Sequence, residues 1–327
     1  MTARPAIACL GAGRMGRGIA VAFAYAGHQV MLIDVKPRSA KEFAKLESEA
    51  LGEIRRTLGS LARLGLLTDG DADAVALRVT VAPMQNSAAA LGGVAIVFEG
   101  VPELVELKRE VLAAASKLVR PEIIIASTTS TILVDDISSA VERPRRFLNV
   151  HWLNPAYLIP LVELSPGAAT DPAIIGRVKA LLEGIGKVPV VCAATPGYIV
   201  PRIQALAMNE AARMVEEGVA SPEDIDKAIK YGFGFRYATM GLLEFIDWGG
   251  GDILYYASRY LEGALHSDRY RAPEVISRNM QEGRIGMRTG AGFLDYAGKD
   301  IDAYREQRLA ALVDMLRHFG LARPPVL

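Results

Sequence analysis

This chain of 327 residues contains few cysteines and histidines and has no excess of positive or negative charge. The two cysteines, Cys9 and Cys192, lie in apolar runs and are expected to be small buried side chains, so no disulfide framework is predicted. Lys and Arg together number 37, as do Asp and Glu. That balance gives no indication of nucleic acid or an anionic membrane surface as a partner.

Long apolar segments are also lacking, and no signal peptide is evident. No apolar run has the length needed to span a bilayer, and no apolar stretch precedes the first predicted strand, so a signal peptide is not expected. With 51% hydrophobic and 23% charged residues, the composition predicts a soluble globular protein with a large core. The length suits two domains, and a reducing cytoplasm is the expected compartment.

Short apolar runs alternate with helical patterns over residues 1–193. Strands are expected at 6–10, 29–33, 79–81, 94–98, 123–126, 147–150, 161–164 and 189–192. Helical patterns cover 14–26 and 103–118, and residues 39–66 predict an amphipathic helical arm that Asp69, Gly70 and Asp71 turn back by about residue 78. Nearly continuous apolar strands joined by helices indicate an α/β fold, a doubly wound sheet covered on both faces.

Helical periodicity alone continues after residue 193. The segment 193–197 is the expected domain boundary, and a smaller all-helical domain is predicted over 194–327. One of its helices has Ser221 as its predicted N-cap and is expected to end at residues 231–234, where two glycines occur.

A glycine-rich turn joins the first strand to the first helix. Gly11 permits a tight turn, Gly13 lets a diphosphate approach the backbone, and Gly16 lets the helix pack closely on the strand. Asp34, after the second strand, is expected to bind ribose hydroxyls and to favour NAD over NADP, although Lys36 and Arg38 follow it closely. The alternatives are a turn without a ligand and, for Asp34, a solvated loop residue.

One histidine and one glutamate lie on successive apolar runs. A neutral imidazole oriented by a carboxylate accepts a proton from an alcohol near neutral pH, so His151 and Glu163 beside a nicotinamide site predict oxidation of a hydroxyl group. A purely structural His–Glu hydrogen bond is the alternative. Ser130, after the strand at 123–126, fits either a substrate-binding hydroxyl or a helix cap. No cluster of residues has metal-ligand spacing, so no metal site is predicted.

These motifs, taken in order, resemble the 3-hydroxyacyl-CoA dehydrogenase family over roughly residues 5 to 296. Besides the glycine turn, the matching segments are Glu99-Gly-Val-Pro-Glu103 with Lys108, Ser127-Thr-Thr-Ser130, His151-Trp-Leu-Asn-Pro155, Leu161-Val-Glu163, Pro196-Gly197-Tyr198 and Gly286-Met-Arg-Thr-Gly-Ala-Gly-Phe293. The resemblance implies a Rossmann domain, a helical domain for substrate binding and dimerisation, a homodimer, and hydride transfer between NAD and carbon 3 of a 3-hydroxyacyl substrate.

The resemblance also implies a role for each matching residue. His151 would be the acid/base, Glu163 its orienting carboxylate, and Ser130 a partner of the reacting oxygen, with Asn154 shaping the same site. The implied cofactor contacts are Gly11, Gly13, Arg14, Met15, Gly16, Asp34, Glu99, Val101, Glu103, Lys108 and Ser127.

In finer detail the chain is similar to the lambda-crystallin and L-gulonate 3-dehydrogenase branch, through Tyr157-Leu-Ile-Pro160 and Phe235-Arg-Tyr-Ala-Thr-Met-Gly241. Members of that branch oxidise free 3-hydroxy acids. One departure is Pro201, where the family usually has an asparagine that reaches the substrate. Proline fits the first turn of a helix but donates no hydrogen bond, and loss of a transition-state donor costs about 3 kcal/mol.

Three functional hypotheses follow from the sequence. The main one is a dehydrogenase of a 3-hydroxybutyryl-CoA-like thioester. The second is a dehydrogenase of a free 3-hydroxy acid such as L-gulonate or carnitine. The third, supported only by Pro201, is an NAD(H)-binding structural or sensor protein with impaired catalysis.

Overall fold

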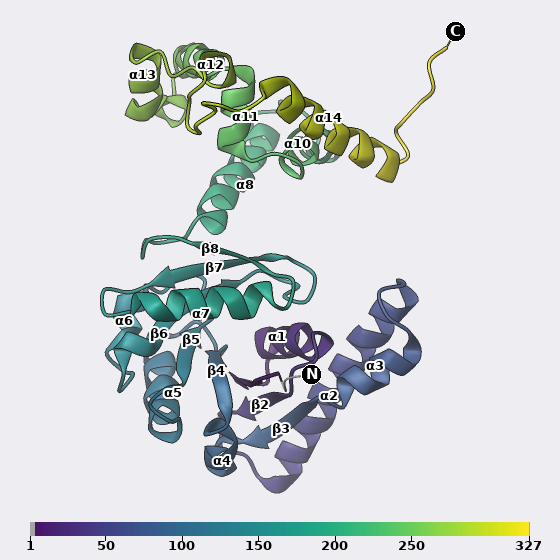
Figure 1. Cartoon of the computed structure of the whole chain (residues 1–327), viewed down its shortest axis with the longest axis vertical. Coiled ribbons are helices and arrows are strands. Elements are labelled where there is room, and N and C mark those ends of the chain that lie inside the picture. Colours follow the sequence, from purple (N-terminus) through teal and green to yellow (C-terminus); the bar gives the residue numbers. More distant parts are fainter. Residues whose placement is uncertain (1–3, 327) are drawn as a thin grey trace. The chain divides into compact units, whose positions relative to one another are not determined.

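The computed structural model describes residues 4–326. The expectation that no signal peptide is present depends partly on residues 1–3, which lie outside the described residues. The chain divides into two compact units, residues 1–208 and 209–327, and the division falls inside helix α8 (Figure 1). Within residues 4–326, no helix combines the length and apolar character needed to cross a membrane.

A single eight-stranded sheet forms the centre of the first unit, in the order β3-β2-β1-β4-β5-β6-β7-β8. Its strands are β1 (Ala6–Leu10), β2 (Val30–Asp34), β3 (Val79–Pro83), β4 (Val94–Glu99), β5 (Ile124–Ser127), β6 (Phe147–Trp152), β7 (Leu161–Pro166) and β8 (Val188–Val191). Strands β1 to β6 are parallel, whereas β7 runs antiparallel to β6 and parallel to β8. The predicted doubly wound α/β sheet is confirmed.

Helices cover both faces of this sheet. They are α1 (Arg14–Tyr25), α2 (Ala40–Arg63), α3 (Asp69–Ala76), η1 (Met84–Asn86), α4 (Ala88–Leu91), α5 (Val105–Leu118), α6 (Val134–Ser138), η2 (Pro144–Arg146) and α7 (Pro172–Glu183). One buried apolar cluster joins α1, α2, α3 and α7 to the sheet, and a second joins α4, α5 and α6 to it. Burial on both faces explains why the parallel strands are apolar almost throughout.

The helical arm turns earlier than the sequence predicted. Helix α2 ends at Arg63, and Asp69 and Asp71 form the first turn of α3 rather than a reversal. The physical reason is a capping box: the Thr68 hydroxyl accepts from the Asp71 amide at 3.2 Å, and the Asp71 carboxylate accepts from the Thr68 amide at 3.1 Å. The chain reverses before this, at residues 64–68, where Gly65 has a φ of 79°.

The edge of the sheet explains a difference between the two cysteines. Cys9, in the central strand β1, is buried as predicted, whereas Cys192 is partly exposed. It follows β8, which has a neighbour on one side only. Both thiols are free.

The second unit consists of helices, and its described residues form isolated bridges but no strand. With α8 (Val200–Glu216) leading into it, its elements are α9 (Pro222–Ala228), η3 (Ile229–Gly234), α10 (Phe235–Tyr237), α11 (Leu242–Gly249), α12 (Gly251–Ala264), η4 (Asp268–Tyr270), α13 (Glu274–Gln281), η5 (Met287–Thr289) and α14 (Ile301–His318). The predicted helical C-terminal part is confirmed. The helix expected to end at 231–234 instead continues through the π-helical turn η3 into α10.

The glycine-rich motif near residue 290 has a structural role around Asp247. The Asp247 carboxylate accepts hydrogen bonds from the amides of Phe293 and Leu294 at 2.9 and 2.8 Å. A Cβ atom at Gly292 would lie 2.0 Å from that carboxylate, and one at Gly286 would lie 2.3 Å from the Asp247 carbonyl oxygen. Only glycine fits at both positions, so packing of the second unit accounts for this motif.

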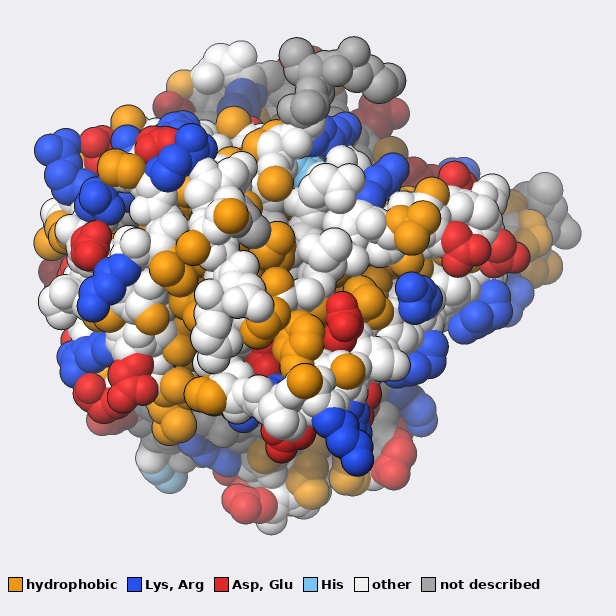
Figure 2. Space-filling model, turned by 90° about the horizontal axis from the view of Figure 1, so that it is seen from below, with side chains coloured by type: hydrophobic (Ala, Val, Ile, Leu, Met, Phe, Trp, Pro, Cys, Tyr) orange, Lys and Arg blue, Asp and Glu red, His pale blue; other side chains and the backbone are white. Residues whose placement is uncertain are grey.

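Basic and acidic side chains are interspersed on the face that Figure 2 shows, with apolar side chains between them. No broad area of one sign is visible among the described residues in that view. This distribution agrees with the equal numbers of acidic and basic residues in the chain.

Candidate active site

The glycine turn has the geometry of a dinucleotide-binding loop. Gly11 has a φ of 99°, which favours glycine. A Cβ atom at Gly16 would lie 2.1 Å from the Gly11 carbonyl oxygen, so the turn and helix α1 approach too closely for any side chain there. At Gly13 a Cβ atom would meet nothing within 4 Å. The open space beside Gly13 and the free amides at the start of α1 fit a diphosphate.

Gly16→Ala and Gly13→Ala are expected to have different effects. The Gly16→Ala methyl would collide with backbone, so we expect a loss of several degrees in Tm and at least about tenfold weaker NAD binding. Gly13→Ala should keep the wild-type Tm but weaken NAD binding to a similar extent, because the methyl would occupy the space that a diphosphate needs. Thermal unfolding without cofactor and calorimetric titration with NAD measure both. Wild-type affinity in Gly13→Ala would contradict the assigned position of the diphosphate.

Asp34 is buried at the end of β2 and pairs with Arg38. Its Oδ2 accepts from Arg38 Nε at 2.6 Å, and its Oδ1 accepts weakly from the Lys36 amide at 3.3 Å. Both Asp34 and Arg38 line a cleft of about 270 Å³ next to Gly11. A guanidinium bonded to Asp34 is not free to act as the counter-ion of a 2′-phosphate, which favours NAD over NADP.

Three of the predicted cofactor residues form a buried polar network below the cleft. Glu99 accepts hydrogen bonds from Lys108 Nζ at 2.9 Å, from Ser127 Oγ at 2.5 Å and from the Val101 amide at 2.7 Å. Glu99, Lys108 and Ser127 are fully buried. Buried charges need such partners, and none of these three side chains is among the residues that line the clefts near the glycine turn.

Glu103 holds the loop that carries Ser130. Its Oε1 accepts from the amides of Ser130 and Thr131, both at 3.0 Å, and from the hydroxyls of Thr129 and Thr131. Partial burial raises the pKa of Glu103. The hydrogen bonds from Thr129 and Thr131 and the charge of Lys108 lower it by more than burial raises it, and the resulting pKa is about 2. Glu103 is therefore ionised at neutral pH. The Ser130 hydroxyl has no hydrogen-bond partner among the described residues.

His151 and Glu163 face each other across two antiparallel strands. They are directly paired in the register of β6 and β7, and His151 Nδ1 lies 2.8 Å from Glu163 Oε2. Glu163 is 0% exposed, and its other oxygen accepts from the amides of Ile199 and Val200 at 3.0 and 2.9 Å. Burial raises the pKa of Glu163, but the hydrogen bonds from His151 and the two amides outweigh it and leave this pKa below its ordinary value.

This arrangement selects one tautomer of His151. An ionised carboxylate only accepts hydrogen bonds, so Nδ1 carries a proton and donates it to Glu163. Nε2 has no hydrogen-bond partner within the part of the chain that the structure describes. His151 can therefore accept a second proton at Nε2, and Glu163 would stabilise the resulting cation.

A cleft of about 620 Å³ brings His151 together with the glycine turn. It is lined by Gly13, Arg14, Met15, Gly100, Val101, Pro102, Glu103, Thr128, Ser130, His151, Trp152 and Asn154. The cleft lies at the carboxyl ends of the parallel strands, where open α/β sheets bind their ligands. His151, Ser130 and Asn154 thus share one cavity, and Glu163 lies behind His151. Gly11 and Asp34 line the neighbouring 270 Å³ cleft, and Gly16 is buried below the turn.

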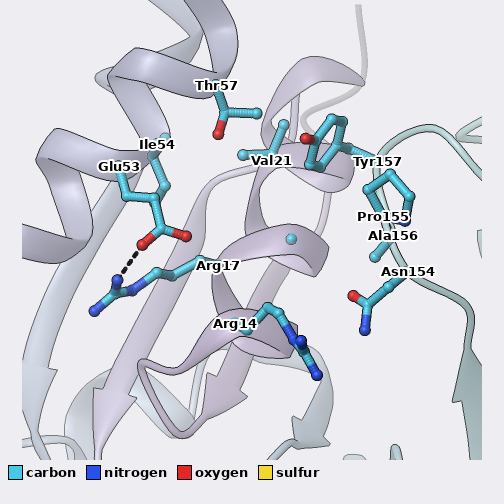
Figure 3. Close-up of a pocket in the computed structure, with 11 residues that line it drawn as sticks. Arg14, Arg17, Val21, Glu53, Ile54, Thr57, Asn154, Pro155, Ala156 and Tyr157 are labelled. Carbon is cyan, nitrogen blue, oxygen red and sulfur yellow. Dashed lines mark hydrogen bonds and ion pairs between the residues drawn. The ribbon is translucent and has the colours of Figure 1, made fainter.

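A second cavity, of about 280 Å³, adjoins this cleft through Arg14 and Asn154, which line both (Figure 3). Arg17, on α1, forms an ion pair with Glu53 on α2, and its Nε donates to the Ala12 carbonyl oxygen at 2.8 Å. Arg14 extends toward the loop of Asn154 and forms no ion pair with the described residues. Sequence reasoning missed Arg17 and Glu53, because α2 comes next to α1 only in the folded chain.

Tyr198 was also missed as a site residue, although it belongs to the Pro-Gly-Tyr motif. Its ring stacks on the His151 imidazole, with 5.1 Å between ring centroids. The motif marked a boundary in the sequence, and nothing in its pattern indicated contact with a strand that lies about fifty residues earlier.

Comparison with protein families matches nearly the whole chain. Residues 6–195 match the family described as "3-hydroxyacyl-CoA dehydrogenase, NAD binding domain", and residues 197–296 match "3-hydroxyacyl-CoA dehydrogenase, C-terminal domain". The resemblance inferred from the motifs is confirmed. NAD is confirmed as the cofactor.

Individual relatives span several substrates. A 5-formyl-3-hydroxy-2-methylpyridine 4-carboxylate 5-dehydrogenase of Mesorhizobium japonicum is 30% identical, over 95% of this chain and 97% of its own length. Lambda-crystallin of Oryctolagus cuniculus is 35% identical, over 78% of this chain and 77% of its own length. The crystal structure of a 3-hydroxyacyl-CoA dehydrogenase from Archaeoglobus fulgidus is similar with a TM-score of 0.75 and 33% identity, covering 98% of this chain and 100% of that one.

Proposed function

The chain belongs to the 3-hydroxyacyl-CoA dehydrogenase family, and on that basis we propose that it transfers a hydride between NAD and carbon 3 of a 3-hydroxybutyryl-CoA-like substrate. The observation that supports this proposal most is the hydrogen bond between His151 and the buried Glu163, in the cleft that also contains Gly13. A proton acceptor next to a nicotinamide site is what oxidation of a secondary alcohol requires.

In this proposal, His151 Nε2 accepts the proton of the substrate hydroxyl during oxidation and returns it during reduction. Glu163 keeps the proton on Nδ1 and stabilises the imidazolium. The Ser130 hydroxyl donates a hydrogen bond to the reacting oxygen, and Asn154 shapes the same cavity. Bound NAD supplies the hydride acceptor. Glu103 would act on this chemistry by holding the loop of Ser130.

The proposed cofactor residues divide into two groups. Gly11, Gly13, Arg14, Met15, Asp34, Val101 and Glu103 line the two clefts and would contact NAD directly. Gly16, Glu99, Lys108 and Ser127 would support those surfaces from below, since they are buried and lie outside the lining of both clefts.

A free 3-hydroxy acid is the second candidate substrate, and two observations favour it over a thioester. Pro201 lies in the first turn of α8, where the family usually has an asparagine. Arg14 offers a guanidinium at the junction of the two cavities, but it would bind a substrate carboxylate and a phosphate of coenzyme A alike, so it does not discriminate between the two candidates. The relative from Mesorhizobium japonicum is named for a pyridine carboxylate and not for a coenzyme A thioester.

Turnover with defined substrates tests this proposal. The full chain is incubated with NAD and either 3-hydroxybutyryl-CoA, L-gulonate or L-carnitine, and the formation of NADH is followed by absorbance. Fastest turnover of the thioester supports the first candidate, and fastest turnover of a free acid replaces it with the second. NAD binding without turnover of any substrate would favour the impaired NAD(H)-binding protein.

A cytoplasmic location stays a prediction from the sequence. We further propose that the protein is a homodimer. Helix α12 supports the dimer because Ile253, Tyr256 and Tyr260, which share one side of it, are 62, 63 and 74% exposed. An apolar stripe of this kind is typical of a surface that a partner covers. Sedimentation equilibrium should give twice the chain mass of 35.1 kDa. A single species at the chain mass would contradict the dimer.

A further inference from the structure

Tyr198 occupies an unusual backbone position beside the catalytic cleft. It lies between β8 and α8 and has a φ of 44°, directly after Gly197 with a φ of 77°. Residues other than glycine rarely adopt this left-handed backbone conformation, so the surrounding structure must hold Tyr198 there. The side chain is only 5% exposed. Its position therefore depends on its contacts.

The ring of Tyr198 packs face to face on His151. The two rings are nearly parallel, at an interplanar angle of 9°. The hydrogen bond between Nδ1 of His151 and Glu163 would be broken by rotation of the imidazole about its last side-chain bond. A flat ring against one face of the imidazole restricts that rotation. The π face of an aromatic ring also attracts a cation.

The hydroxyl of Tyr198 joins two other parts of the site. It donates to the Thr129 carbonyl oxygen at 3.0 Å and accepts from Asn149 Nδ2 at 3.1 Å. Asn149 lies on β6, two residues before His151, and Thr129 directly precedes Ser130. One buried hydroxyl thus links the strand of the proton acceptor to the loop of the oxygen-binding serine.

The charged and titratable groups around Tyr198 leave it a neutral donor. Burial is the main cause that raises the pKa of Tyr198, and the nearby Glu103, Cys192 and Glu163 act in the same direction, whereas the hydrogen bond from Asn149 opposes them. A neutral phenol keeps its proton for the Thr129 carbonyl oxygen at the pH of catalysis.

We propose that Tyr198 is a positioning residue for the dehydrogenase reaction. Its ring holds His151 against Glu163, and its hydroxyl keeps the loop of Ser130 in register with β6. The two residues that follow it contribute to the same arrangement, since the amides of Ile199 and Val200 bind the second oxygen of Glu163. This inference depends on the proposed function, because it assigns Tyr198 to the chemistry proposed for His151 and Ser130.

Two substitutions separate the ring from the hydroxyl. Tyr198→Phe keeps the stacked ring and removes both hydrogen bonds. We expect kcat to fall about tenfold, since two hydrogen bonds of ordinary strength no longer join the loop of Ser130 to β6. The KM for substrate and the affinity for NAD should change less than twofold. Tyr198→Leu keeps the site apolar but removes the π face. The measured pKa of His151 should then differ from that of the wild type because the aromatic face is gone, which Tyr198→Phe should not cause.

The pKa of His151 is measured directly by NMR on protein with labelled histidine, without cofactor or substrate. The chain has four histidines, and the spectrum of His151→Gln identifies the signal. Tyr25→Phe is the matched control, because its hydroxyl also donates to a carbonyl oxygen, that of Leu66 at 2.8 Å, outside the catalytic cleft. It should leave kcat and the pKa of His151 unchanged.

The inference is overturned if Tyr198→Phe keeps the wild-type kcat and Tyr198→Leu keeps the wild-type pKa of His151. It is also overturned if both variants only lower Tm, with unchanged kcat per folded molecule. If the wild-type chain turns over no substrate, the proposed function fails, but the pKa of His151 in Tyr198→Leu still tests the stacking contact by itself.

Discussion

His151→Gln is expected to lower kcat/KM by about 100- to 10,000-fold, the usual contribution of a general acid–base residue. Glutamine can still bond to Glu163, so the strands and the cleft should be preserved, but its amide cannot accept a proton at neutral pH. NAD should bind with wild-type affinity, because the glycine turn is formed by β1 and α1. Steady-state rates of NADH formation and calorimetric titration with NAD measure the two quantities.

His28→Gln is the control for this variant. His28 is also buried and also uses Nδ1, which lies 2.8 Å from the Pro5 carbonyl oxygen. It precedes β2 and therefore lies at the amino ends of the parallel strands, whereas His151 lies near the carboxyl end of β6. We expect its kcat/KM to stay within about twofold of wild type, since His28 does not line the cleft that contains His151. Near wild-type activity in His151→Gln would refute the proposed mechanism.

Glu163→Gln is expected to lower kcat by about 100- to 1,000-fold. The oxygen of the new amide can accept from the amides of Ile199 and Val200, which leaves its NH₂ group to donate to His151 Nδ1. Nδ1 must then be unprotonated, so the proton moves to Nε2 and His151 can no longer accept one from the substrate. A wrong tautomer is known to abolish most of the activity of comparable catalytic pairs.

A double-mutant cycle separates this effect from general damage to the site. If Glu163 acts through His151 alone, Glu163→Gln should cost almost nothing further when His151→Gln is already present. Independent, additive losses would show that Glu163 has another role, and the tautomer explanation would then be wrong.

Stability should depend on pH in a direction set by Glu163. The pKa of this carboxyl is lower in the folded protein than its ordinary value, so the ionised form stabilises the fold above the ordinary pKa. That contribution is lost as the pH falls through the lowered pKa of the folded state. Glu163→Gln should therefore lower the unfolding free energy by about 1–3 kcal/mol at neutral pH, and the difference from wild type should shrink in acid. Urea unfolding at several pH values measures it.

Much of the fold was predictable from local pattern. The strands containing Ile7, Val97 and Ile125 are apolar on both faces, and the periodicity of α1 and α2 is strong. The prediction of a turn at 69–71 was wrong, because a capping box starts helix α3 there. The prediction that a helix ends at 231–234 was also wrong, because the chain continues through these glycines as a π-helical turn. Both errors concern short-range alternatives between which the pattern of apolar residues does not discriminate.

The sequence by itself determined the strands of the sheet and the glycine turn, because spacing along the chain encodes periodicity and turn chemistry, and it singled out His151 as the candidate proton acceptor. Only the tertiary structure decided that β7 runs antiparallel to β6, which brings Glu163 opposite His151, and that Tyr198 stacks on the imidazole. It also decided that Glu99, Lys108 and Ser127 bind one another below the cleft. The physical reason is that such contacts join segments far apart in the chain, so their partners are selected by packing and by the need to pair buried charges.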